Sequence, residues 1–173
     1  MKRLVLATAF VILLAFAVGA QGAPKAGEFG VQGAVIFTSV GGTSAGDVGV
    51  KYVITDKIAV RAGLGLLSQS SGGNSASFYS LGVGFEYHLA PKAGVSPYAG
   101  GELSYSGESL SSGGTTPTDF AIAGVFGGEY FFSPNFSWAG EARVGFDSSS
   151  TVGTTTTTIG TFGFATFLTW FVN

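Results

Sequence analysis

Residues Ser77 to Leu89 read SFYSLGVGFEYHL, and this stretch decides the fold. Every second position carries a large apolar or aromatic side chain: Tyr79, Leu81, Val83, Phe85, Tyr87 and Leu89. The positions between them carry small, polar or charged residues, namely Ser80, Gly82, Gly84, Glu86 and His88, and only Phe78 breaks the rule. Successive side chains of a strand point to opposite sides, so this pattern predicts a strand with one apolar face.

The same period of two continues on both sides of this stretch. Gly, Val, Phe, Thr and Tyr dominate from Glu28 onward, where a helix would favour Ala, Leu, Glu and Lys. We predict eight strands: Glu28 to Thr38, Asp47 to Thr55, Ile58 to Ser68, Ser77 to Leu89, Val95 to Tyr105, Phe120 to Phe131, Phe136 to Asp147 and Thr158 to Val172.

The predicted connections alternate in length. Three are tight turns of Pro, Asp and Asn, at residues 55–57, 90–93 and 133–135. Four are longer stretches of Gly, Ser and Thr: Ser39 to Gly46, Gln69 to Ala76, Ser106 to Thr118 and Ser148 to Thr157. In an antiparallel up-and-down barrel the short turns and both termini lie at one end, and the long loops lie at the other.

The size of the apolar face indicates what it contacts. It carries roughly thirty large side chains, whereas the interior of an eight-stranded barrel holds only side chains of ordinary mixed size. A soluble barrel of the lipocalin type would place its apolar face inside, so the number of large side chains disfavours it. Strands of this length with polar residues inside and apolar residues outside are typical of a transmembrane barrel. Closure satisfies every backbone hydrogen bond within the lipid. We therefore predict an all-β, eight-stranded antiparallel transmembrane β-barrel.

Composition and the amino terminus favour export. The chain is 46% hydrophobic but only 10% charged, whereas roughly a quarter of residues are charged in soluble domains. Met1-Lys2-Arg3 and the apolar run that follows are typical of a secretory signal peptide, cleaved after Ala20; the alternative is a retained membrane anchor. The predicted organisation is a signal peptide over residues 1–20, a linker over residues 21–27 and a barrel over residues 28–173.

Zero cysteines exclude disulfides, and a net charge of −2 without a basic stripe argues against nucleic-acid binding.

Aromatic residues gather at the predicted short-turn end. Tyr52, Tyr87, Tyr130, Trp138 and Trp170 all fall on the outward face at this level. Amphipathic rings prefer the boundary between lipid and water. We expect these five residues to form an interface aromatic girdle.

The inward face carries charged residues that the barrel would enclose. They are Lys51, Arg61, Glu86, His88, Glu102, Glu129, Glu141 and Arg143. Unpaired charges are costly in a low-dielectric lumen, so we expect a paired network, with Arg61 opposite Glu86. The network is interpreted as a structural plug of the lumen; the alternative is a gated ion path.

His88 and Glu86 lie on one face two residues apart, which also permits an acid/base or triad interpretation. No serine in a distinctive motif stands beside His88, and we interpret His88 as a lumen residue bonded to Glu86 or water. No catalytic residue, cofactor or metal site is predicted.

These patterns together resemble the small eight-stranded outer-membrane barrels of Gram-negative bacteria, such as the OmpX proteins and the membrane domain of OmpA. The resemblance implies an outer-membrane location with short turns and termini in the periplasm, lipids and the barrel-insertion machinery as partners, and a monomer. It implies a structural or surface-interaction role; a narrow transporter for small or apolar solutes, as in OmpW-like relatives, and a lipid-modifying enzyme are the alternatives. One departure is the final residue, Asn173, where the family usually ends on an aromatic residue.

Overall fold

A computed structural model describes residues 25–38, 45–71, 74–89, 94–110, 117–151 and 153–172. The predicted signal peptide, most of the predicted linker and Asn173 lie outside these residues. Within the described part of the chain, no helix has the length and the apolar character needed to cross a membrane.

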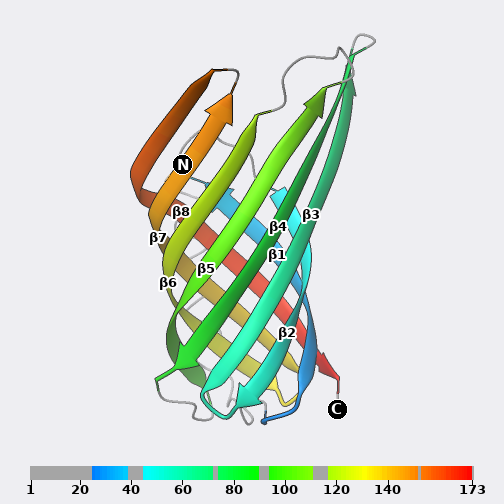
Figure 1. Cartoon of the computed structure of the whole chain (residues 1–173). Helices are drawn as coiled ribbons and strands as arrows, with labels where there is room; N and C mark the ends of the chain where they lie inside the picture. Colours follow the sequence, from blue (N-terminus) through cyan, green and yellow to red (C-terminus); the bar gives the residue numbers. More distant parts are fainter. Residues whose placement is uncertain are drawn as a thin grey trace, which may run out of the picture.

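Eight strands form one closed antiparallel barrel, in which each strand pairs with its neighbours in sequence and β1 pairs with β8 (Figure 1). The strands are β1 (Phe29–Thr38), β2 (Ala45–Thr55), β3 (Ile58–Ser71), β4 (Asn74–His88), β5 (Val95–Leu110), β6 (Thr118–Ser133), β7 (Phe136–Thr151) and β8 (Thr154–Val172). Pairing of Phe29 with Val172 closes the ring at the end that holds the short turns. The prediction of an all-β, eight-stranded barrel is confirmed.

The strands reach further toward the other end of the barrel than the sequence pattern predicted. The predicted long loop Gln69 to Ala76 is wrong, because β3 continues to Ser71 and β4 begins at Asn74. The predicted loop Ser148 to Thr157 is also wrong, because β7 and β8 continue to a tight turn that includes Gly153 at φ +71°. The alternation of apolar residues ends where the strands leave the lipid. The backbone hydrogen bonds between strands do not depend on lipid, so the strands continue through Ser and Thr residues.

The outward face is the apolar one. Leu64, Leu81, Val83 and Phe85 are all exposed in the isolated barrel, as lipid-facing side chains must be. The alternation predicted for the last strand breaks at a bulge, where Arg143 pairs with Gly163 but Val144 pairs with Thr161. Gly163 has φ +137°, a conformation that L side chains rarely adopt, so glycine permits the bulge.

The inward face is less polar than the sequence pattern indicated. Among the described residues, two clusters of buried apolar residues lie inside the barrel. One contains Val53, Phe131 and Phe171 near the short turns. The other, higher in the barrel, contains Tyr98, Val125, Ala139, Ala165 and Phe167. Large side chains therefore fill the short-turn half of the lumen together with the charged residues.

Candidate functional site

Strands β2 to β7 supply the charged residues that meet inside the lumen. Each lies at an inward position of its strand, and most alternate with an exposed apolar neighbour, as Glu86 does with Phe85 and Tyr87. All eight residues predicted from the sequence come together: Lys51, Arg61, Glu86, His88, Glu102, Glu129, Glu141 and Arg143. We refer to these eight residues as the lumen network.

The half of the network nearer the short turns is centred on Lys51. Its Nζ atom donates to Glu86 Oε2 at 2.5 Å and to Glu129 Oε2 at 2.7 Å. Ser137 Oγ donates to the second Glu129 oxygen at 2.6 Å. Lys51, Glu86 and Glu129 are at most 1% exposed, so no water screens these ion pairs.

The other half of the network is centred on Arg61. Its guanidinium makes two hydrogen bonds to Glu141, at 2.7 and 2.8 Å, and a third to Glu102 at 2.7 Å. Arg143 contacts the same two carboxylates, at 3.0 Å from Glu102 and 2.8 Å from Glu141. The two arginines and two glutamates therefore balance each other's charge.

Two further contacts join and support these halves. Arg61 Nη1 lies 3.2 Å from Glu86 Oε1, which links the arginine group to the lysine group. The Phe167 ring lies beneath both guanidinium groups, with centroid distances of 4.7 Å to Arg61 Cζ and 5.8 Å to Arg143 Cζ. The result is a continuous layer of ion pairs across the lumen.

The predicted bond between His88 and Glu86 is present, and the structure adds a serine that the sequence pattern did not single out. Ser96 Oγ lies 2.8 Å from His88 Nδ1, and His88 Nε2 lies 3.2 Å from Glu86 Oε2, so a serine does stand beside the histidine. The order Ser, His and Glu is that of a hydrolytic triad. However, Ser96 is fully buried, so its hydroxyl cannot reach a substrate. The contact is a structural hydrogen bond of the lumen, which the sequence could have suggested because Ser96 and His88 are both inward residues flanking one turn.

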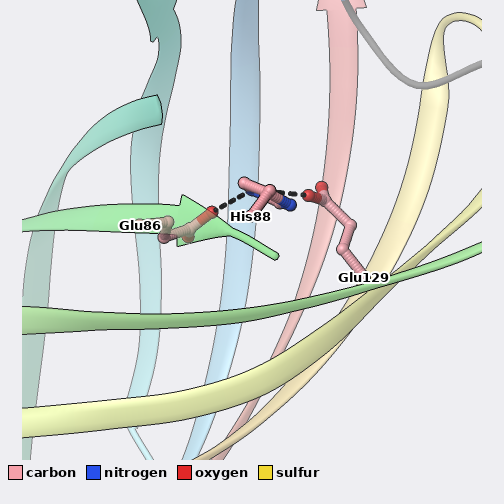
Figure 2. A group of neighbouring side chains, drawn as sticks. All are labelled: Glu86, His88 and Glu129. Atoms are coloured by element: carbon pink, nitrogen blue, oxygen red, sulfur yellow. Dashed lines mark hydrogen bonds and ion pairs between the residues drawn. The ribbon is translucent and has the colours of Figure 1, made fainter. Parts of the chain in front are cut away.

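Glu86, His88 and Glu129 point toward one another from β4 and β6, with His88 between the two carboxylates (Figure 2). Their ligand atoms lie within 4.8 Å of one another, which is close enough to hold a metal ion. The Lys51 ammonium already bonds to both carboxylates. This cation supplies the positive charge that a metal would bring, so the geometry favours the lysine as the occupant of the group.

Sequence reasoning missed other residues of the lumen besides Ser96. Tyr98 donates its hydroxyl to Glu141 Oε2 at 3.0 Å, and Gln32 donates to Thr169 Oγ1 at 3.1 Å. Ser137 and Phe167 also belong to this set. Their positions in the strand alternation predict that they face inward, but they carry no charge that would distinguish them from other inward residues.

The five residues of the predicted aromatic girdle lie in different environments. Tyr52, Tyr87 and Trp170 are exposed on the outward face, and Trp138 is half-buried with its Nε1 donating to Thr166 Oγ1 at 2.5 Å. Tyr130 is only 5% exposed and packs against Phe132, with ring centroids 4.9 Å apart. Its ring is covered by protein and offers little surface to an interface.

Above the network, on the side away from the short turns, the lumen holds a cavity of 540 Å³. Arg61, Glu102 and Arg143 form its floor. Its walls include many inward residues without large side chains, such as Gly63, Gly82 and Ser104. The two halves of one barrel therefore differ in what fills them.

Comparison with known proteins places this geometry in a family. The model of the outer membrane protein beta-barrel domain matches residues 4–165. No curated protein matches the chain. Among solved structures, the outer membrane protein OprG from Pseudomonas aeruginosa is similar, with 15% identity, a TM-score of 0.51, and coverage of 86% of this chain and 96% of that chain. The amino-terminal barrel domain of OprF from the same organism has 17% identity, a TM-score of 0.46 and coverage of 84% and 96%. Neisserial surface protein A has 20% identity, a TM-score of 0.48 and coverage of 82% and 94%.

Proposed function

The chain belongs to the outer membrane protein beta-barrel family and is a protein of the bacterial outer membrane, and we propose that it serves there as a structural and surface-interaction protein with a plugged lumen. The resemblance inferred from the sequence is thereby confirmed at the level of the family. The specific role rests on the lumen network, which is the observation that carries the proposal.

The network supports a plug because its ion pairs cross the lumen from β2 to β7. A permeating ion would have to separate Lys51 from Glu86 and Glu129, all of which are buried. Breaking a buried pair leaves uncompensated charge and costs about 3–5 kcal/mol. The apolar cluster of Val53, Phe131 and Phe171 lies nearer the short turns and adds a second obstruction.

The proposal includes an orientation and partners. Short turns join β2 to β3 and β6 to β7 at the end where β8 terminates, and we place this end in the periplasm. The hydroxyl-rich tips of the β3–β4 and β7–β8 hairpins then extend outside the cell as the contact surface. Lipids surround the apolar face, the barrel-insertion machinery is a transient partner, and the protein acts as a monomer.

A planar-bilayer experiment tests the plug. We expect the purified, refolded protein to show little or no steady conductance, because ions cannot pass the network without breaking buried pairs. A gel shift on heating confirms that the sample is a folded barrel. Reproducible large channels from that sample would contradict the plugged lumen.

A narrow transporter for small or apolar solutes is the second candidate, and the cavity of 540 Å³ is the observation that favours it. The cavity brings a solute as far as the arginine pair, after which the network would have to rearrange. A liposome-swelling assay with small uncharged solutes distinguishes the candidates. Swelling above that of protein-free vesicles favours transport, and its absence favours the structural role.

A further inference from the structure

The cavity above the network is built from successive rows of inward residues. One row runs Asp47, Gly65, Ser80, Ser106 and Asp119, each paired with the next across adjacent strands. The next row toward the hairpin tips runs Leu67, Phe78 and Glu108. Two residues along a strand separate these rows by roughly 7 Å. The chemistry of the rows differs, and together they define what the cavity can bind.

Leu67 and Phe78 form part of the apolar lining of the cavity. They pair with each other on β3 and β4, they line the cavity, and they are 41% and 36% exposed. Phe78 is the residue that breaks the alternation of the Ser77 to Leu89 stretch. A structural filler would be buried, whereas exposed apolar side chains inside a cavity provide a surface for an apolar ligand.

The charged residues of the cavity walls above the floor are all acidic: Asp47, Glu108 and Asp119. Ser80 Oγ donates to Asp47 Oδ1 at 3.3 Å, and Ser106 Oγ donates to Asp119 Oδ2 at 3.4 Å, so each carboxylate keeps further acceptor capacity. After Arg61 the chain has only two basic residues, Lys92 and Arg143. In the sequence, Lys92 falls between the end of β4 at His88 and the start of β5 at Val95, outside the described residues.

The floor does not neutralise these carboxylates. Arg61 and Arg143 are both engaged by Glu102 and Glu141 at 2.7 to 3.0 Å. The wall acids Asp47, Glu108 and Asp119 therefore leave the cavity with an excess of negative charge next to an apolar surface. A volume of 540 Å³ suits a small molecule, since ligand pockets span about 300–1,000 Å³.

We propose that this cavity binds a small amphipathic organic cation. The apolar body of the ligand lies against Leu67 and Phe78, and its ammonium group donates to the Asp119 carboxylate and to the Ser106 hydroxyl beside it. The ligand stays above the cavity floor formed by Arg61, Glu102 and Arg143 and does not pass it. The proposal therefore goes beyond the proposed function and holds whether or not any solute crosses the barrel.

Three matched probes test the charge requirement: 2-phenylethylamine, which is cationic at neutral pH, 2-phenylethanol, which is neutral, and 3-phenylpropionate, which is anionic. Each is titrated by calorimetry into the full barrel refolded in lipid nanodiscs, with protein-free nanodiscs as the reference. We expect the amine to bind at least about tenfold more tightly than the alcohol, which corresponds to about 1.4 kcal/mol, and the anion not to bind.

Two variants locate the site. Asp119→Asn should weaken amine binding several-fold and bring it close to that of the alcohol, and Phe78→Ser should weaken the amine and the alcohol alike. Asp56→Asn, in the exposed β2–β3 turn, is the matched control and should change neither. A heat-dependent gel shift verifies that each variant is folded.

Several results would overturn the proposal: no binding of the amine, equal binding of the amine and the anion, or amine binding that both Asp119→Asn and Phe78→Ser leave unchanged. Conductance and swelling are measured separately, so failure here leaves the plugged-lumen test intact.

Discussion

The two halves of the barrel interior share one architecture and differ in content. In the half near the short turns, Lys51, Glu86 and Glu129 are buried in mutual contact, and Phe131 and Phe171 fill the remaining space. In the half toward the hairpin tips, the same inward positions carry residues such as Gly63, Gly82 and Ser104 around a cavity. The same strand alternation therefore produces a sealed region and an open one, depending only on the size and charge of the inward residues.

This difference indicates which half of the interior contributes more to the stability of the barrel and which half can bind a ligand. Lys51, Glu86 and Glu129 in the sealed half are all committed to partners, so removing one leaves another buried and unpaired. The open half has acceptors around a cavity and space beside Gly63 and Gly82, so changes there alter the shape and charge of the cavity more than the stability of the barrel. Three pairs of substitutions test this division.

The largest effect is expected for Lys51→Met. It leaves Glu86 and Glu129 without their shared ammonium and should lower the free energy of unfolding by about 3–5 kcal/mol. Urea unfolding in lipid vesicles, followed by tryptophan fluorescence, measures the change. The control, Lys57→Met in the exposed β2–β3 turn, should stay within about 0.5 kcal/mol. A double variant, Lys51→Met with Glu129→Gln, should recover part of the lost stability. If Lys51→Met were as stable as the wild type, the proposed difference between the two halves would be wrong.

A smaller effect is expected for Ser137→Ala. The fully buried Ser137 hydroxyl donates to Glu129 at 2.6 Å, and loss of a hydrogen bond to a charged group costs about 1.5–3 kcal/mol. Its counterpart in the open half is Ser80→Ala, where the bond to Asp47 is 3.3 Å long and only partly buried. That change should cost less than about 0.5 kcal/mol. Similar losses for the two variants in the same unfolding assay would show that burial does not separate the halves.

The smallest effect compares two inward glycines. A Cβ at Gly100 would collide with the Phe85 carbonyl oxygen, so Gly100→Ala should destabilise the barrel by about 1–3 kcal/mol. A Cβ at Gly63 would meet nothing within 4 Å, so Gly63→Ala should change stability by less than about 0.5 kcal/mol. Thermal gel-shift midpoints rank the two variants. A destabilised Gly63→Ala would mean that the open half is packed as tightly as the sealed one.

Much of the candidate site was readable along the chain. Each charged residue of the lumen network alternates with an outward apolar or aromatic neighbour, as Glu86 does with Tyr87, so its inward face could be predicted. The partners were harder to predict. Arg61 pairs through its backbone with Gly84, yet its guanidinium reaches Glu141, eighty residues further along the chain. Side-chain reach across the lumen, unlike strand parity, has no sequence periodicity.

The sequence by itself determined the alternation of faces, the number of strands and the sign of each inward residue, because a strand's side-chain period depends only on local geometry. Only the tertiary structure decided how far β3, β4, β7 and β8 extend. The ends of these strands consist mostly of polar residues, so the sequence shows no alternation of apolar residues there. It also decided that Ser96 meets His88 and that Phe78 lines a cavity. Those outcomes depend on barrel closure, which brings distant strands face to face across a narrow lumen.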